Sequence, residues 1–224
     1  MVTNNNIDKV IKIIKKQVKR YEDPATENIA GDYRTPFFIL VTTLLSARTK
    51  DKVTETVSRK LFKKIKNAKD LIRLKQAHLA RLIYPIGFYR TKARHLKELA
   101  RVLAQRYNNK VPDEMEKLLT LPGVGRKTAN LVLIIAFNKY GICVDTHVHR
   151  IVNRWGYIRS KTPQASEMYL RQKLPKKYWK TINHLLVSYG KTICRPVNPL
   201  CQRCQVKCYC SYGMKEKNKE GIKR

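Results

Sequence analysis

Several kinds of segment are missing from this 224-residue sequence. No apolar run approaches the length of a membrane span, and the polar, then lysine-rich start has no secretory signal. Sustained alternation of apolar and polar residues with a period of two, the pattern of half-buried strands, is also absent. The sequence contains no internal repeat. These absences predict an intracellular, all-α protein.

Acidic residues are scarce, since 16 Asp and Glu stand against 48 Lys and Arg, for a formal net charge of +32. A charge this large exceeds what solubility requires and implies a polyanionic partner, because each neutralised phosphate releases counterions. An acidic membrane surface could also use the charge, but the missing span and signal favour nucleic acid inside the cell. A run of charge is usually a solvated face, so we assign no individual lysine from it.

Apolar residues recur at helical spacing along most of the chain. The first such segment, residues 7–18, has lysines on its outer face. Further helices are predicted at 36–47, 51–65, 76–83, 91–107, 164–174 and 178–189, the last of them stopped by Gly190. The lysine-rich tail, residues 215–224, is predicted to be disordered.

The sequence LPGVGRKTA, residues 121–129, joins a short amphipathic segment to a long apolar one. Pro122, Gly123, Val124 and Gly125 predict the tight turn of a helix-hairpin-helix, whose glycines permit positive φ and close backbone approach. Amides at the start of the second helix then face a ligand with the positive end of the dipole, which suits a DNA phosphate. Glycine pairs also serve many helix junctions that bind nothing, so the turn alone leaves both interpretations open.

Lys127 falls in the first turn of that second helix, where the dipole and nearby cations disfavour the charged form of its amine. A neutral lysine amine is a nucleophile that can form a Schiff base. The plain alternative is a solvated or phosphate-contacting lysine. Asp145 follows in VDTH, before apolar residues at helical spacing, and its plain alternative is a helix N-cap. A solvated or phosphate-contacting Lys127 does not explain Asp145, and an N-cap at Asp145 does not explain Lys127.

Four cysteines lie within 17 residues of each other near the end of the chain, at Cys194, Cys201, Cys204 and Cys210. Their spacing lets four thiolates converge on one metal centre, and by itself it leaves tetrahedral zinc and a [4Fe-4S] cluster open. Disulfides are a third option that suits an intracellular chain badly. Of the other two cysteines, Cys143 is predicted to be a buried thiol and Cys208 a bystander.

LPGVGRKTANLVL followed by VDTHVHRIVNR resembles the endonuclease III family of helix-hairpin-helix DNA glycosylases. The resemblance runs from about residue 36 to residue 210, through PFFILVTTLLSARTKD and the cysteine segment. It implies that Lys127 is the Schiff-base nucleophile and Asp145 the catalytic carboxylate. It also implies that the C-x6-C-x2-C-x5-C pattern is a structural [4Fe-4S] site.

The activity that the resemblance implies is a bifunctional DNA glycosylase/AP lyase of base excision repair. Such an enzyme excises oxidised pyrimidines and cuts the strand 3′ to the abasic site by β-elimination. We therefore expect a cytoplasmic, nucleoid-associated monomer that binds double-stranded DNA with damaged bases or abasic sites, and no membrane. The implied architecture is a six-helix barrel domain with the hairpin at 29–139 and a smaller all-α [4Fe-4S] domain from 1–28 and 140–224.

Two positions depart from the family's pattern. Arg48 stands where relatives often carry a glutamine that fills the space left by the extruded base, and Phe88 replaces the leucine expected in the wedge loop. The plain alternatives are a surface cation and a core aromatic. His147, two residues after Asp145, is a secondary candidate for holding the DNA site, although a lone histidine is more often structural. The departures leave the preferred lesion and opposite base open.

Two other functions remain as alternatives. A monofunctional uracil or thymine mismatch glycosylase of the same superfamily typically lacks a lysine at this hairpin position. A noncatalytic iron-sulfur protein would use the hairpin and the cluster only to grip the DNA backbone. The presence of both Lys127 and Asp145 favours the lyase over either alternative.

Overall fold

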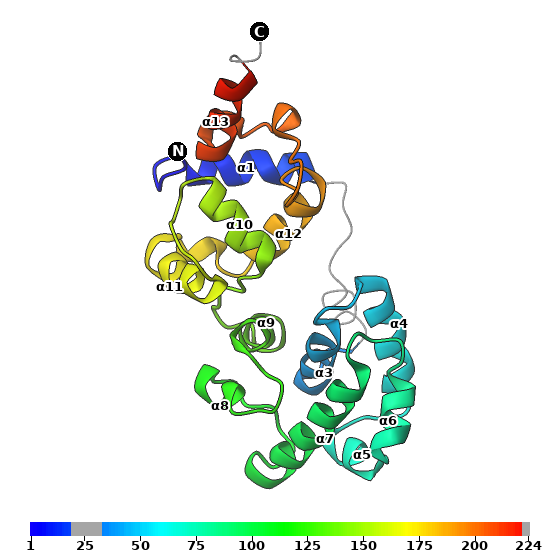
Figure 1. Ribbon diagram of the computed structural model, residues 1–224. Coiled ribbons are helices and arrows are strands. Elements are labelled where there is room, and N and C mark those ends of the chain that lie inside the picture. The colour runs from blue at the N-terminus through cyan, green and yellow to red at the C-terminus, as the bar shows by residue number, and fades with distance from the viewer. Residues whose placement is uncertain (19–32, 221–224) are drawn as a thin grey trace. The chain divides into compact units, whose positions relative to one another are not determined.

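A computed structural model describes residues 1–18 and 33–220 of the chain (Figure 1). The chain divides into a hairpin unit, Asp23–Gly141, and a cysteine unit, Met1–Glu22 with Ile142–Arg224. Within the described ranges every regular element is a helix, which confirms the all-α prediction. The boundary predicted between residues 28 and 29 lies outside the described residues. No helix in the described part is long and apolar enough to cross a membrane.

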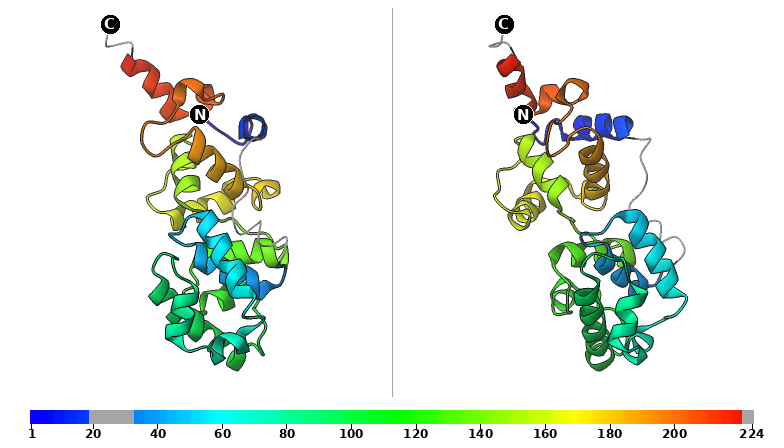
Figure 2. Two further views of the ribbon diagram at one scale, coloured as in Figure 1. Left: turned by 90° about the vertical axis from the view of Figure 1, so that its right-hand side faces the viewer. Right: turned by 45° about the vertical axis from the view of Figure 1, so that its right-hand side comes forward.

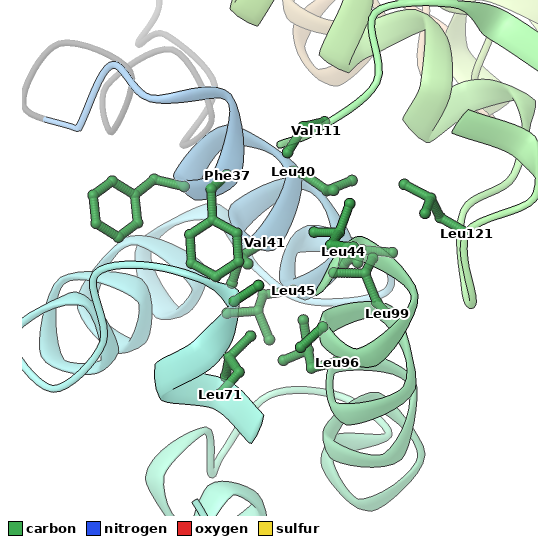
Figure 3. Close-up of a cluster of buried hydrophobic side chains, with 14 of the residues drawn as sticks. Phe37, Leu40, Val41, Leu44, Leu45, Leu71, Leu96, Leu99, Val111 and Leu121 are labelled. Atoms are coloured by element: carbon green, nitrogen blue, oxygen red, sulfur yellow. The ribbon is translucent and has the colours of Figure 1, made fainter. Parts of the chain in front are cut away.

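The hairpin unit is built around one helix that is apolar on all sides. Its helices are α3 (Pro36–Ser46), α4 (Asp51–Phe62), α5 (Ala68–Arg73), α6 (Gln76–Leu82), α7 (Tyr89–Arg106), α8 (Met115–Leu119) and α9 (Arg126–Phe137). Every residue of α3 from Phe37 to Leu45 is buried, as expected for a helix surrounded by others. It packs against α4, α7 and α9. Figure 3 shows Leu44 of α3 beside Leu96 and Leu99 of α7 in this core.

The N-terminus of α3 follows directly from its sequence. Thr35 accepts a hydrogen bond from the Phe38 amide at 3.4 Å, and Pro36 occupies the first turn, where no amide donor is needed. The C-terminal end of the same helix has no basic residue of its own. Ser46 of the same helix donates its hydroxyl to the Thr43 carbonyl at 2.8 Å, whereas the Leu45 carbonyl takes its donor from another helix.

The cysteine unit combines both ends of the chain. Its helices are α1 (Ile7–Val18), α10 (Thr146–Arg154), α11 (Pro163–Lys173), α12 (Ile182–Thr192) and α13 (Ser211–Glu220), with short 3-10 turns at Lys176–Tyr178, Cys201–Arg203 and Lys207–Tyr209. α12 packs against both α1 and α10, which Figure 2 shows from two further sides. The largest side chains in this core are Trp155, Tyr157 and Tyr189. The N-terminal helix is thus part of the same core as the C-terminal helices.

Two predictions about the helices were wrong, and one helix was missed. Gly190 does not stop its helix, because α12 continues to Thr192, and Gly190 is buried inside it. The tail is not disordered throughout, because α13 extends to Glu220, while residues 221–224 lie outside the described part. The short helix α5 was not predicted, and it begins at a capping box in which Asn67 and Asp70 bond each other's backbone amides.

Candidate active site and cysteine centre

The predicted hairpin is a tight turn between α8 and α9, and its two glycines serve different purposes. Gly123 has a φ of +79°, and the turn closes with a hydrogen bond from the Val124 amide to the Leu121 carbonyl at 3.0 Å. A β-carbon on Gly123 would also lie 3.0 Å from Nδ1 of His95. Gly125 has an ordinary φ of −98°, and a β-carbon there would meet no atom within 4 Å. Gly123 makes the turn possible, whereas Gly125 borders open space.

Lys127 lies in the first turn of α9, two residues after the N-cap Gly125. Its side chain is exposed, and that first turn contains no acidic residue. The first amides of a helix have no partner within it and carry the positive end of its dipole. The sequence prediction therefore placed this lysine correctly on the helix, next to a backbone that suits an anion.

Arg48 and Phe88 border the same cavity as the hairpin. Both residues line it together with Lys92, His95, Gly123 and Thr128. The guanidinium carbon of Arg48 lies 5.3 Å from the centroid of the Phe88 ring, and Phe88 is 62% exposed. Phe88 is therefore not a core aromatic, and the structure brings it together with Arg48 and the hairpin, all within the hairpin unit.

Asp145 is the N-cap of α10. Its Oδ1 accepts hydrogen bonds from the backbone amides of His147 at 2.9 Å and Val148 at 3.0 Å. Both capping bonds use a single carboxylate oxygen. An N-cap role and a catalytic role are therefore compatible for this residue, because both capping bonds are made to Oδ1.

Two arginines of α10 connect this helix to the cysteine segment. Arg150 donates to the Cys194 carbonyl at 2.8 Å, and Arg154 donates to the Arg195 carbonyl at 2.6 Å. Nη1 of Arg154 also lies 3.5 Å from Sγ of Cys194. Sequence reasoning missed both arginines because the chain is rich in cations. The only signal is their spacing of four residues, which puts them on one face of the helix.

His147 is held inside the cysteine unit. Its Nδ1 lies 3.2 Å from Nη2 of Arg150, and its ring packs on Gly190 of α12. This placement gives the histidine a clear packing role. Contact with DNA by His147 stays a prediction.

The four clustered cysteines line one cavity of the cysteine unit. Burial raises the pKa of the Cys204 and Cys210 thiols above the ordinary value. The Tyr189 hydroxyl lies 2.8 Å from Sγ of Cys204, and the Gly213 amide donates to Sγ of Cys210 at 3.4 Å. Among the described residues, no group of three or more Cys, His, Asp or Glu could hold a single metal ion. The four cysteines therefore face one shared space.

The remaining two cysteines lie where the sequence predicted. Cys143 is completely buried, which confirms its prediction as a core thiol. Cys208 is exposed and does not line the cavity, although it lies only two residues before Cys210.

Comparisons with known proteins agree with this geometry. The model of HhH-GPD superfamily base excision DNA repair proteins matches residues 41–176. Endonuclease III of Thermotoga maritima is 46% identical over 177 residues, which cover 79% of this chain and 83% of that protein. The chain belongs to the endonuclease III family. It is accordingly a DNA glycosylase/AP lyase of base excision repair.

Solved structures support the same family. A trapped endonuclease III-DNA covalent intermediate superposes with a TM-score of 0.85 at 32% identity, covering 97% of this chain and all of that one. A thermostable thymine-DNA glycosylase superposes with a TM-score of 0.79 at 28% identity, covering 94% of this chain and 99% of that one. The mismatch glycosylase alternative is therefore the less favoured one.

Proposed function

We propose that Lys127 and Asp145 are the catalytic pair of a bifunctional glycosylase/AP lyase that acts on oxidised pyrimidines in double-stranded DNA. The observation that carries this proposal is the place of Lys127, exposed in the first turn of α9 beside the open space at Gly125. A phosphate bound at the amides of that turn would hold the damaged strand next to the amine. Arg48, Phe88 and the hairpin border one cavity, which supports a role for all of them in binding DNA.

The reaction begins when the neutral Lys127 amine attacks the sugar carbon C1′. The bond from C1′ to the base breaks, and the base leaves with the electron pair and takes up a proton. The nitrogen lone pair then forms the C=N double bond as the C1′–O4′ bond of the sugar ring breaks, and O4′ takes up the proton that the amine loses. The resulting imine acidifies the neighbouring carbon C2′. Loss of a proton there expels the 3′ phosphate, which cuts the strand by β-elimination and leaves the protein to be released by hydrolysis.

Asp145 contributes a negative charge from the N-terminus of α10. Its carboxylate stabilises the positive charge that develops on the sugar as the base departs, or accepts the proton that keeps the amine neutral. Capping through Oδ1 fixes the orientation of the carboxylate relative to α10. A fixed charge of this kind needs little reorganisation during the reaction.

The cysteine centre fits a [4Fe-4S] cluster held by Cys194, Cys201, Cys204 and Cys210. Support comes from four soft thiol donors around one cavity, at the C-x6-C-x2-C-x5-C spacing that resembles the [4Fe-4S] site of the family. When bound, such a cluster would cross-link the short turns of the C-terminal segment. It would take no part in the base chemistry. The arginines of α10 hold the first cysteine's loop, so the same helix carries Asp145 and supports the cysteine centre.

The two units correspond to the two domains that we propose. The hairpin unit would be the helix-hairpin-helix domain, 29–139, and the cysteine unit the cluster domain, 1–28 with 140–224. The contact-defined units Asp23–Gly141 and Met1–Glu22 with Ile142–Arg224 support this division. We infer that the enzyme is a cytoplasmic monomer associated with the chromosomal DNA of the nucleoid.

Reductive trapping with borohydride on abasic duplex DNA tests the catalytic proposal. The wild-type protein should form a covalent adduct, and Lys127→Ala should abolish it without loss of DNA binding. Lys117→Ala is the matched control, because Lys117 is an exposed lysine of α8 on the other side of the hairpin, paired with Glu114. An undiminished adduct in Lys127→Ala contradicts the assignment. Base release by the wild type with no adduct would instead identify a monofunctional glycosylase.

A further inference from the structure

Lys92 connects the end of one helix to the start of another. It lies in the first turn of α7, and its Nζ donates to the Leu45 carbonyl at 2.8 Å and the Ala47 carbonyl at 2.5 Å. A third acceptor, Oγ1 of Thr49, lies at 3.4 Å. These acceptors belong to the last turn of α3 and the loop that follows it.

Physical chemistry explains why a lysine is needed there. The last carbonyls of α3 have no backbone donor within the helix and carry the negative end of its dipole, and α3 has no basic residue in its last turn. Ser46 Oγ donates to the Thr43 carbonyl, but the Leu45 carbonyl takes its donor from Lys92. Lys92 supplies both the donors and the positive charge from α7. Its side chain is only half-exposed, and burial lowers the pKa of Lys92 to about 8.

A lysine with such a pKa is a possible nucleophile, but its contacts favour another role. An ammonium group has three N–H donors, and Lys92 has three acceptors within 3.4 Å. A nucleophile needs a lone pair directed at its substrate, whereas this nitrogen is surrounded by oxygens. The geometry is that of a clamp.

The clamp lies between two strained residues. Arg48 and Phe88 have φ values of +54° and +57°, in the left-handed region that residues other than glycine rarely adopt. Arg48 follows Ala47, whose carbonyl Lys92 binds, and Phe88 accepts a helical hydrogen bond from the Lys92 amide at 3.0 Å. Such conformations persist only where the surroundings enforce them, and they concentrate at functional sites.

A second contact fixes the two segments against each other. The Gly87 amide donates to Oγ1 of Thr49 at 3.1 Å. A β-carbon on Gly87 would lie 2.5 Å from the Arg48 carbonyl oxygen, so the two backbones touch at this point. The segment before α7 and the segment after α3 therefore meet through Lys92, Thr49 and Gly87.

We propose that Lys92 is a positioning residue for lesion recognition, which holds Arg48 and Phe88 together on the rim of the cavity beside the hairpin. The inference rests on the proposed function only in assuming that this rim meets DNA. Without the clamp, the end of α3 separates from α7, and the exposed Phe88 ring loses its fixed place under the Arg48 guanidinium. Binding to undamaged DNA depends mainly on charge and changes little, whereas selection of a damaged site depends on short-range fit.

The test compares Lys92→Met with Lys97→Met, which removes a similar clamp elsewhere on α7. Nζ of Lys97 donates to the Ile72 and Leu74 carbonyls, both at 2.5 Å, at the end of α5, and Lys97 does not line the cavity. The first readout is the affinity for duplex DNA with an uncleavable abasic analogue relative to undamaged duplex. Lys92→Met should lower this ratio by roughly tenfold or more, as misplacement of binding groups does. Lys97→Met should leave the ratio unchanged, even if it lowers the melting temperature by as much as Lys92→Met does.

A double-mutant cycle separates positioning from a general loss of structure. If Lys92 acts through Phe88, Lys92→Met should cost little further discrimination in a Phe88→Ala background, while its effect on the melting temperature should stay the same in both backgrounds. Lys92→Gln, which keeps an amide donor without the charge, provides a milder variant if Lys92→Met does not fold.

Equal loss of discrimination in the Lys92 and Lys97 variants would overturn the proposal, and so would independent, additive effects of Lys92→Met and Phe88→Ala. The readout is binding to an unreactive analogue, so it does not depend on catalysis. Failure of the Lys127 chemistry would appear separately, as the absence of a trapped adduct.

Discussion

A β-carbon placed on Gly190 of α12 would lie 2.4 Å from Nδ1 of His147 on α10. It would also lie 2.9 Å from Nη2 of Arg150, which donates to the Gly190 carbonyl at 3.3 Å. The absence of a side chain at Gly190 therefore sets how closely α10 and α12 approach. Because Asp145 caps α10, this contact fixes the helix that carries the proposed catalytic carboxylate.

Gly190→Ala should destabilise the protein. Alanine favours a helix over glycine by up to about 1 kcal/mol, but overpacking of a close contact costs roughly 1–3 kcal/mol. We expect the clash to dominate, because the His147 ring and Arg150 both occupy the space. Thermal or denaturant unfolding measures the effect. The control is Gly125→Ala, where no atom lies within 4 Å and the change should stay below about 1 kcal/mol.

Asp145→Asn should separate the capping role from the catalytic role. Asparagine caps a helix about as well as aspartate, so the free energy of unfolding should change by less than about 1 kcal/mol. Base excision should fall by roughly two orders of magnitude or more, because the charge that stabilises the transition state is lost. Single-turnover excision on a duplex with one oxidised pyrimidine measures this effect. Near-normal excision would mean that Asp145 is only a cap.

The sequence predicted the helical elements because burial follows a helical period, as in α1, where Ile7, Val10, Ile11 and Ile14 are all buried. It predicted the hairpin because Gly123 needs a positive φ. Gly190 was misinterpreted because glycine usually marks a helix end, and only the packing of α10 shows why one is tolerated inside α12. Such a contact between distant segments leaves no trace in local sequence.

The Lys92 clamp could not be predicted for the same reason. Its acceptor at Leu45 is 47 residues away in the chain, and Lys92 is one of 48 basic residues. The sequence left the role of Phe88 open between a wedge residue and a core residue, because an aromatic residue after a glycine suits either. Its 62% exposure excludes the core.

Cys194→Ser should prevent assembly of the cluster, whereas Cys208→Ser should not. Cys194 lines the cavity and Cys208 does not, although both lie in the same cysteine-rich segment. Protein purified without oxygen should be yellow-brown and contain about four irons per chain, as a [4Fe-4S] centre requires. Metal analysis and visible absorbance measure both variants against the wild type. One zinc and negligible iron per chain would contradict the assignment.

Salt should separate the contribution of charge from that of the Phe88 rim. With a net charge of +32, affinity for undamaged duplex should fall steeply and linearly with salt on a log-log plot, because several counterions are released. Discrimination for a damaged duplex should persist as salt rises, since it depends on contacts shorter than the screening length. Phe88→Ala should keep the same salt slope, because it removes no charge, but should lose discrimination at every salt concentration.

Titrations of both duplexes with both proteins across a salt series measure the two effects. A weak slope in the wild type would assign most of the charge to the general composition of the chain. Unchanged discrimination in Phe88→Ala would show that the exposed ring takes no part in recognising the lesion.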